Sequence, residues 1–252
     1  MFISITFMKN LLLLILFSAF TFPVKSYPDA GEILKKVDAN MNAKTRIITS
    51  KMIINGRRGS RTVSSKSYSE GDTKAFTEYL SPEREKGTKM LKLDDMLWIY
   101  SPSSDRTIQL SGHMLRQSVM GSDMSYEEVM EDRKLTDLYN AKVLSEEMVN
   151  DRKSWVLELD AKVSDVAYTK RKTWIDQERY VPLKEELYAK SGKLLKKITY
   201  SNVAKVNGRW FPKKVNYKDM LKTGNGTDFI MESIQLNPSI PDYIFSKASL
   251  KK

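Results

Sequence analysis

The sequence predicts a mainly β fold, in which a large antiparallel sheet curls around an apolar cavity and is joined by an N-terminal helix and a short helical lid. Over most of the chain, apolar and polar residues alternate with the period of two that strands have. Turn sequences such as Asn55-Gly56 and Asn207-Gly208 separate these alternating segments. Strands that such turns connect directly form an antiparallel sheet, whereas parallel sheets need helical crossovers.

Residues 11–22, LLLLILFSAFTF, form an apolar run near the N-terminus. The run is shorter than the ~20 residues that a membrane-spanning helix needs. It follows Lys9 and is succeeded by small and polar residues up to Ser26, an arrangement typical of a secretory signal. We therefore expect residues 1–26 to be a cleaved signal peptide and residues 27–252 to form a single exported domain. An uncleaved anchor is the alternative.

The composition excludes several kinds of functional site. The 252-residue chain has no cysteine, which excludes disulfide frameworks, thiolate nucleophiles, iron–sulfur clusters and zinc fingers. Its one histidine, His113, excludes a metal site built from several histidines. We therefore expect neither a metal nor a cofactor.

The chain is strongly basic, with 42 lysine and arginine residues against 31 acids. Removal of residues 1–26 would take away two of the 42 bases and none of the 31 acids, which leaves a net charge of +9. In an exported protein this surplus favours an anionic lipid surface or an acidic partner over nucleic acid. A basic surface that only keeps the protein soluble explains the charge equally well.

The first element after the signal is an amphipathic helix. Asp29 and Glu32 have the spacing of a helix-capping signature. Behind them, Ile33 and Val37 belong to one apolar stripe with helical spacing. The pattern predicts a helix over residues 30–44.

The strands follow the helix. We expect them, in chain order, at 47–54, 61–69, 73–80, 87–93, 96–100, 105–110, around Trp155–Asp160, and at 169–175, 181–189, 194–204, 209–219 and 227–236. A twisted sheet of this many strands closes or curls. The run Met96–Tyr100 is apolar on both faces, so both faces need a cover. Too few helices are expected to fill the concave face, which leaves an apolar cavity of the kind that suits an acyl chain.

The strand pattern is interrupted at residues 111–139. Ser125 and Glu128 form a second capping signature, which predicts a short helix. Six methionines lie between Met90 and Met130, in and just before this interruption. Methionine is flexible and suits surfaces that accept varied apolar shapes, so we expect a lid or a ligand contact here. Ordinary filling of the core is the alternative.

Signals for catalysis are weak. Neighbouring acids such as Glu127-Glu128 and Glu185-Glu186 point in different directions in a helix or a strand, so we interpret them as solvated charges and not as acid–base pairs. Gly56 to Gly59 spells the GXXG of a nucleic-acid-binding loop, yet it joins two expected strands and is better explained as a hairpin turn. We expect neither an enzyme nor a nucleic-acid-binding protein.

Several segments resemble, in order, the LolA-like family of outer-membrane lipoprotein-sorting proteins, which includes members encoded beside RND-type exporters. The most specific is residues 120–128, MGSDMSYEE, which is similar to the family signature M-G-S-D-aromatic-S-Y-E-D. Met124 and Val129 stand where the family more often has an aromatic residue and leucine. The resemblance spans about residues 29–250 and includes the segments Lys86–Leu91, Leu97–Pro102, Trp174–Asp176, Tyr180–Lys184, Gly208–Pro212 and Ile240–Phe245.

The resemblance implies an incomplete β-barrel whose cavity carries acyl chains of lipids or lipoproteins across the periplasm under a helical lid. Many relatives carry a lipid-attachment cysteine, which this chain lacks, so we expect a soluble periplasmic protein. We also expect it to be a monomer. From alternation and resemblance together, the expected cavity wall is Met90, Trp98, Tyr100, Trp155 and Leu157, and the expected lid is Met120, Met124, Tyr126 and Val129. Alternation leaves open which face of each strand is the inner one, because a shift of one residue exchanges the two.

The expected function is a carrier that binds acyl chains non-covalently and passes them toward the outer membrane, together with an RND-type inner-membrane transporter. Two alternatives stay open. One is a periplasmic sensor that binds stray lipids or lipoproteins and regulates a membrane partner. The other is an accessory subunit of an RND exporter that binds no lipid.

Overall fold

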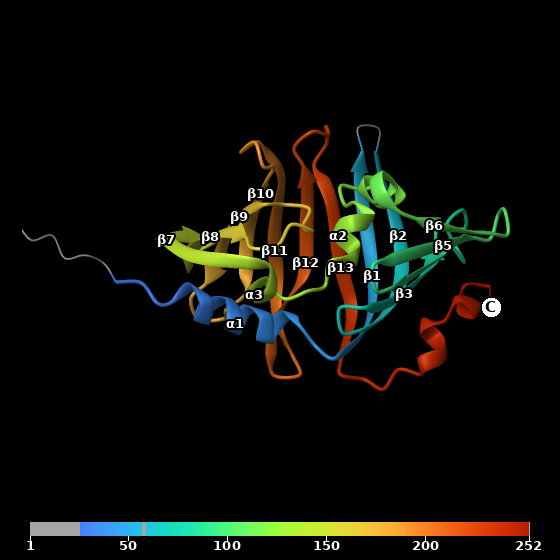
Figure 1. Ribbon diagram of the computed structural model, residues 1–252, viewed down its shortest axis with the longest axis horizontal. Helices are drawn as coiled ribbons and strands as arrows, with labels where there is room; N and C mark the ends of the chain where they lie inside the picture. Colours follow the sequence, from blue (N-terminus) through green and yellow to red (C-terminus); the bar gives the residue numbers. More distant parts are fainter. Residues whose placement is uncertain (1–25, 57–58, 252) are drawn as a thin grey trace, which may run out of the picture.

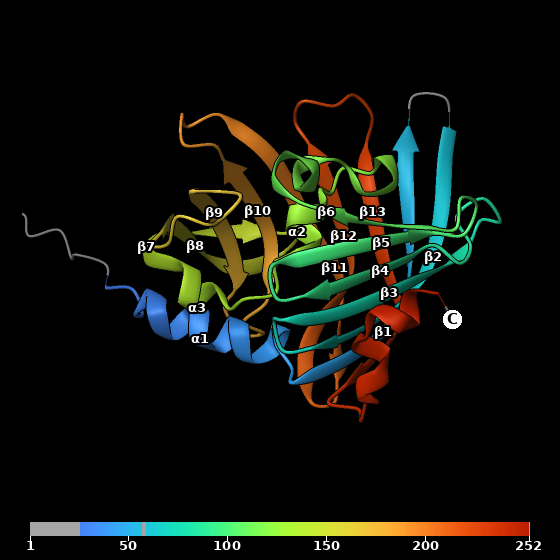
Figure 2. The same ribbon diagram turned by 45° about the vertical axis from the view of Figure 1, so that its right-hand side comes forward.

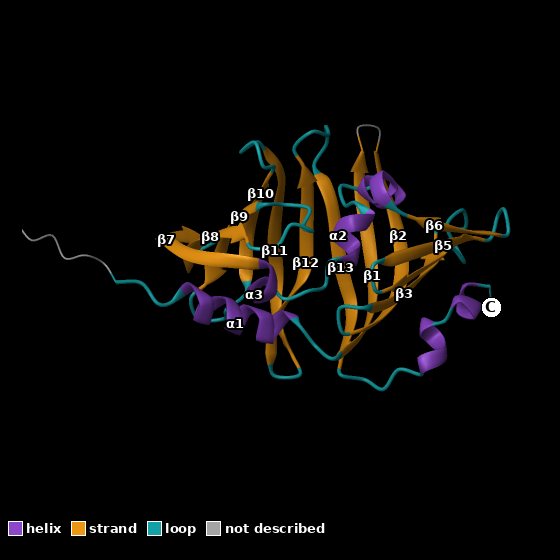
Figure 3. Ribbon diagram, viewed as in Figure 1, coloured by secondary structure: helices purple, strands orange, loops and turns teal. Residues whose placement is uncertain are grey.

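One antiparallel sheet forms the body of the molecule (Figure 1). The computed structural model describes residues 26–56 and 59–251, and within them 13 strands lie in the order β6-β5-β4-β3-β2-β1-β13-β12-β11-β10-β9-β8-β7. Their bounds are β1 (Thr45–Gly56), β2 (Gly59–Glu70), β3 (Lys74–Ser81), β4 (Lys89–Leu93), β5 (Met96–Ser101), β6 (Arg106–Leu110), β7 (Tyr139–Val149), β8 (Arg152–Ala161), β9 (Lys170–Asp176), β10 (Pro182–Tyr188), β11 (Leu194–Val206), β12 (Arg209–Asp219) and β13 (Gly226–Leu236). The sheet curls, with β6 and β7 as its two edges, and the predicted mainly β, curled antiparallel fold is confirmed (Figure 3).

The predicted N-terminal helix is α1 (Ala30–Met41). The carboxylate of Asp29 accepts a hydrogen bond from the backbone N–H of Glu32 at 2.9 Å, as the capping signature predicts. The apolar stripe of the helix, which includes Val37, is buried against β7, β8 and β9. The helix ends three residues earlier than predicted because the backbone of Asn42 is extended.

The sequence missed one strand, β7. Its first half alternates well, with Tyr139 and Val143 directed toward the helix α1 cluster. A register shift between Val143 and Ser145 then interrupts the alternation, and the exposed pair Glu146-Glu147 follows. A β-bulge of this kind breaks the alternation of apolar and polar residues from which strands are predicted, because it moves the apolar positions from one face of the strand to the other.

The C-terminal segment covers the convex face of the sheet, which is the face turned away from α1. It contains two short 3-10 helices, η3 (Asp242–Phe245) and η4 (Lys247–Leu250), and they pack on β3, β4 and β5 (Figure 2). Strand β5 therefore has apolar cover on both faces, as its sequence requires.

Among the helices in the described part of the chain, none has the length and apolar character needed to cross a bilayer. The predicted signal peptide, residues 1–26, lies outside the described residues except for Ser26, and it stays a prediction.

An ion pair between β8 and β9 gives the fold a measurable sensitivity to acid. Arg152 Nε donates to Asp176 at 2.8 Å, and the same carboxylate accepts the backbone N–H groups of Glu178 and Arg179. Burial raises the pKa of Asp176, but these hydrogen bonds outweigh burial and hold that pKa below its usual value. A carboxyl group with a lowered pKa stabilises the fold above its unfolded pKa, about 3.9, and this stability is lost as the pH falls through the folded-state pKa.

We therefore expect the free energy of unfolding, measured by urea denaturation, to fall between pH 5 and pH 3, and to fall less steeply in Asp176→Asn. The variant should also be less stable than the native protein at pH 7. Equal pH dependence in the two proteins would contradict the role given to Asp176.

Candidate functional site

A cavity of about 280 Å³ lies between the sheet and the segment that joins β6 to β7. We call residues 111–132 the lid; it contains the 3-10 helices η1 (Gly112–Arg116) and η2 (Val119–Gly121) and the helix α2 (Tyr126–Met130). A second short helix, α3 (Leu135–Leu138), leads from the lid into β7. The cavity is lined by Arg46, Ile48, Met52, Ser65, Ser67, Tyr68, Ser69, Ala75, Thr77, Tyr79, Met90, Val119, Met124, Glu128, Val129, Glu131, Asp132, Tyr217 and Phe229.

Small side chains on β2 and β3 make this part of the sheet hollow. Ser65, Ser67 and Ser69 occupy alternate positions of β2, and Ala75 and Thr77 lie opposite them on β3. Each serine hydroxyl has a protein partner: Ser67 pairs with Thr77 at 2.9 Å, Ser65 pairs with Ser50 at 3.1 Å, and Ser69 accepts from Arg46 Nε at 3.1 Å. Their polarity is therefore satisfied without water, and the space that larger residues would fill is left to the cavity.

The wall and roof of the cavity are largely apolar. Met52 and Phe229 contribute to the wall, together with Tyr79, whose buried hydroxyl donates to the sulfur of Met90 at 3.2 Å. Burial raises the pKa of Tyr79 well above its usual value, so the phenol stays neutral.

The predicted lid residues and one predicted wall residue come together in this region. Met124 and Val129 line the cavity from above, and Met90 lines it from β4. Met120 and Tyr126 pack in the same apolar cluster as Met90, next to the cavity but not on its surface.

Trp98 and Tyr100, which were expected in the wall, lie on the convex face of the sheet. Met90 pairs with Ile99 across β4 and β5, so Met90 and Ile99 share the inner face and their neighbours point outward. Trp98 packs with Phe245 of the C-terminal segment, in a cluster that also contains Tyr100. This part of the prediction is corrected: alternation identified the apolar residues of β5 but not which of its two covered faces is the inner one.

Trp155 and Leu157 lie on the concave face but do not line the cavity. Both pack beneath α1, in a cluster with Ile33 and Leu34. The ring of Trp155 also contacts that of Tyr180, with centroids 5.5 Å apart. The prediction is corrected here too, because the N-terminal helix fills the part of the concave face that these two residues occupy.

Charged side chains separate the α1 cluster from the cavity. Arg171 on β9 forms a buried ion pair with Glu185 on β10, and the hydroxyl of Tyr200 donates to the other carboxylate oxygen at 2.7 Å. Burial, and after it the nearby Glu185, raises the pKa of Tyr200 well above its usual value, which keeps it a donor. Between the α1 cluster and the cavity, the concave face thus carries these polar groups beside a further apolar cluster that includes Ile198 and Val215.

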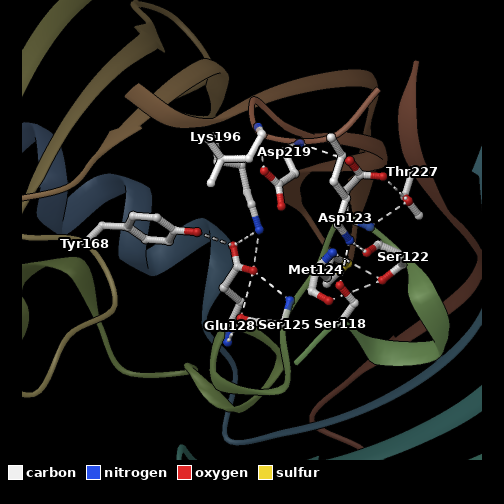
Figure 4. Close-up of polar contacts among 12 residues, drawn as sticks. Ser118, Ser122, Asp123, Met124, Ser125, Glu128, Tyr168, Lys196, Asp219 and Thr227 are labelled. Carbon is white, nitrogen blue, oxygen red and sulfur yellow. Dashed lines mark hydrogen bonds and ion pairs between the residues drawn. The ribbon is translucent and has the colours of Figure 1, made fainter. Parts of the chain in front are cut away.

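A second buried ion pair ties the lid to the sheet (Figure 4). Glu128 of α2 completes the predicted capping box with Ser125, whose backbone N–H donates to the Glu128 carboxylate at 2.7 Å. The same carboxylate accepts a charged hydrogen bond from Lys196 on β11 and one from the hydroxyl of Tyr168 at 2.9 Å. Burial and then Glu128 raise the pKa of Tyr168, so its proton stays in this bond. We call the contacts of Glu128 with Lys196 and Tyr168 the latch.

Asp123 fixes the first half of the lid to the β12–β13 hairpin (Figure 4). Its carboxylate accepts the backbone N–H of Asp219 at 3.0 Å and the hydroxyl of Thr227 at 2.8 Å. The backbone N–H of Asp123 returns a hydrogen bond to the same Thr227 oxygen at 3.0 Å. The polar residues of the 120–128 segment thus hold the lid in place, while Met124 contacts the cavity.

Replacing Asp123 by alanine should lower the free energy of unfolding by about 2–3 kcal/mol, because two donors that it satisfies would lose their acceptor. Hydrogen exchange should rise in residues 118–125 and stay unchanged in α1. The conservative variant Asp123→Asn keeps one acceptor oxygen and should show a smaller change. Equal exchange in native protein and Asp123→Ala would show that this contact does not hold the lid.

The sequence pointed to the lid but not to its partners on the sheet. Lys196 and Thr227 lie in predicted strands, and nothing in the sequence distinguishes them from solvated strand residues. The serines at alternate positions of β2, from Ser65 to Ser69, are a usable signal, because small residues on the inner face of a curled sheet leave space.

Comparisons with known proteins show which proteins the chain resembles. A family model described as an uncharacterized protein matches residues 71–252, most of the chain. An outer membrane lipoprotein-sorting protein domain from Vibrio parahaemolyticus is 25% identical, with a TM-score of 0.78 over 88% of this chain and 98% of that one. A LolA superfamily protein from Nitrosomonas europaea is also 25% identical, with a TM-score of 0.74 over 88% of this chain and all of the other. The chain belongs to the family of that model, and it is similar in sequence and fold to these LolA superfamily proteins.

Two further comparisons concern a third solved structure and the curated proteins. A DUF1329 family protein from Desulfovibrio piger is 22% identical and has a TM-score of 0.79, over 87% of this LolA-like chain and 97% of that protein, which shows a shared fold. No curated protein matches the sequence.

Proposed function

We propose that this LolA-like protein is a soluble, monomeric periplasmic carrier that binds the acyl chains of lipids or lipoproteins in the lidded cavity and moves them toward the outer membrane. The observation that supports it most is the cavity itself. Its wall and roof are mainly apolar, and the latch and Asp123 hold the lid over it. Burying an acyl chain there is favourable by about 0.8 kcal/mol per methylene, so affinity does not require a charged recognition group.

The size of the cavity implies that the lid moves. Ligand pockets usually have about 300–1,000 Å³, and this one, with about 280 Å³, lies just below that range. A long acyl chain needs more room than the closed lid leaves. The lid rests on short helices joined by irregular segments, and it can be displaced without breaking a strand pair of the sheet.

We further propose that the protein exchanges its ligand with an inner-membrane transporter of the RND type. Residues 120–128 resemble the signature of the LolA-like family, and that family includes members encoded beside such exporters, which supports this partner. The basic surplus of the chain, 42 lysines and arginines against 31 acids, is compatible with an acidic or anionic partner.

Native mass spectrometry tests the carrier proposal. The full chain is expressed in a bacterium, recovered from the periplasm without detergent, and sprayed under conditions that preserve non-covalent complexes. We expect a one-to-one adduct with a phospholipid or an acylated peptide, which lipid extraction then identifies. A protein that carries no lipid and takes up none from added phospholipid would count against a carrier and favour an accessory subunit.

A further inference from the structure

Two neighbouring hairpins end beside the lid, at the top of the view in Figure 1. The turn between β12 and β13 exposes two large apolar side chains, Met220 at 41% and Leu221 at 64%. The turn between β10 and β11 exposes Lys190 and Lys193. The backbone N–H of Met220 donates to the carbonyl oxygen of Leu195 at 2.8 Å, so the two hairpins are held side by side.

The charge around the apolar pair has one dominant sign. Residues 188–195 and 217–227, which form the two turns and their flanks, contain four lysines and one aspartate. That aspartate, Asp219, accepts the backbone N–H of Leu221 at 2.9 Å, which turns it toward its own loop. Exposed apolar side chains with lysines nearby suit the surface of an anionic bilayer. The apolar side chains enter the headgroup region, and the lysines contact lipid phosphates.

The β12–β13 turn is also bonded to the lid. Lys222 Nζ donates to the hydroxyl of Ser118 at 2.6 Å and to the carbonyl oxygen of Ser122. At the other end of the turn, the backbone N–H of Asp219 donates to Asp123. These hydrogen bonds therefore couple any displacement of the β12–β13 turn to the first half of the lid.

We propose that the β12–β13 turn docks the protein on an anionic bilayer, with Met220 and Leu221 in the interface and the exposed Lys190 and Lys193 of the neighbouring turn against the headgroups. Docking brings the lid to the bilayer surface through Lys222 and Asp123. The docking itself is independent of the carrier function; its consequence for the lid rests on that proposed function.

Single cysteines test the docking directly, because the native chain has no cysteine. Leu221→Cys is labelled with the environment-sensitive dye NBD and mixed with vesicles of phosphatidylglycerol and phosphatidylcholine. The matched control is Met148→Cys, since Met148 on the edge strand β7 is 62% exposed, almost as much as Leu221. We expect a blue shift and a several-fold rise in fluorescence at position 221 and no change at position 148. No change at position 221, or equal changes at both, would overturn the proposal and leave the turn as a surface for a protein partner.

Vesicle sedimentation of unlabelled protein gives the second readout. Met220→Ser with Leu221→Ser should lower partitioning onto anionic vesicles about tenfold, and Met148→Ser should not lower it. Binding should weaken with added salt and with vesicles of phosphatidylcholine alone. Acyl-chain binding is measured in parallel without vesicles. A variant that loses vesicle binding but keeps its acyl ligand supports docking, and a native protein that binds vesicles but no acyl ligand refutes only the carrier proposal.

Discussion

Replacing Lys196 by methionine should lower the free energy of unfolding by roughly 3–5 kcal/mol, because the Glu128 carboxylate would stay buried without its cation. The side chains of Lys196 and Glu128 are only 5% and 11% exposed, so water cannot replace the ammonium group without opening the lid. Tyr168 would still donate one hydrogen bond to Glu128. Urea denaturation at neutral pH, followed by circular dichroism, measures the difference.

Adding Glu128→Gln to the Lys196→Met variant should restore most of that stability. The double variant removes both charges. The glutamine oxygen still accepts from the backbone N–H of Ser125, so the capping box survives, and the glutamine NH2 group can donate to the hydroxyl oxygen of Tyr168. The matched control is Lys35→Met, which breaks the ion pair with Glu32 on the surface of α1, where the side chains are 67% and 62% exposed. It should change stability by less than about 0.5 kcal/mol. A Lys196→Met cost no larger than that of Lys35→Met would contradict a buried latch.

The latch has a consequence for ligand exchange. A lid that a buried ion pair holds opens rarely, because each opening separates the charges and rehydrates them. The double variant keeps a lid of similar shape but removes the charge pairing. It should therefore exchange lid amide hydrogens and acyl ligands faster than the native protein at similar global stability. This separates the role of the latch in gating from its role in folding.

Much of the fold follows from local chemistry that the sequence displays. Alternation and hairpin turns predict twelve of the strands, and the capping signatures at Asp29 and Ser125 predict the starts of α1 and α2. The strand β7 was missed because its bulge after Val143 breaks the period on which the prediction depends. Pattern-based prediction works where each residue's environment repeats along the chain, and it fails where one residue is inserted.

The site was less accessible to prediction because it depends on contacts between distant segments. Met90, Met124 and Val129, which the sequence assigned to the wall and the lid, line the same cavity in the structure, and their role in binding stays a prediction. Trp98 was assigned to the wrong face because both faces of β5 are apolar, one beneath the lid and the other beneath the C-terminal segment. Lys196 meets Glu128 across 68 residues, and no local spacing indicates such a pair.

Met124→Asp should weaken acyl-chain binding by on the order of 100-fold while leaving the fold intact. Met124 lines the roof of the cavity and is only partly buried, so a carboxylate there can reach water when the protein is empty. A bound chain would cover that carboxylate and would also lose the contact with the methionine, and these two costs together reach a few kcal/mol. Met96→Asp is the matched control, since Met96 is exposed and lies outside the cavity. Displacement of a fluorescent fatty acid measures the affinity, and equal affinities of the two variants would remove Met124 from the site.

Filling the floor tests the same cavity from the side of the sheet. Ala75 on β3 lines the cavity, and Ala75→Leu adds three carbon atoms there without removing a side-chain hydrogen bond. Because the cavity loses volume and not polarity, the variant should keep binding short acyl chains and lose affinity for long ones. Each methylene that no longer fits costs about 0.8 kcal/mol, so two or three of them lower affinity roughly 10- to 50-fold. Chains of eight to sixteen carbons, compared in native protein and variant, give the length at which affinity stops rising. A shift to shorter chains in Ala75→Leu places the chain against β3, whereas the same length limit in both proteins would mean that acyl chains bind elsewhere in the molecule.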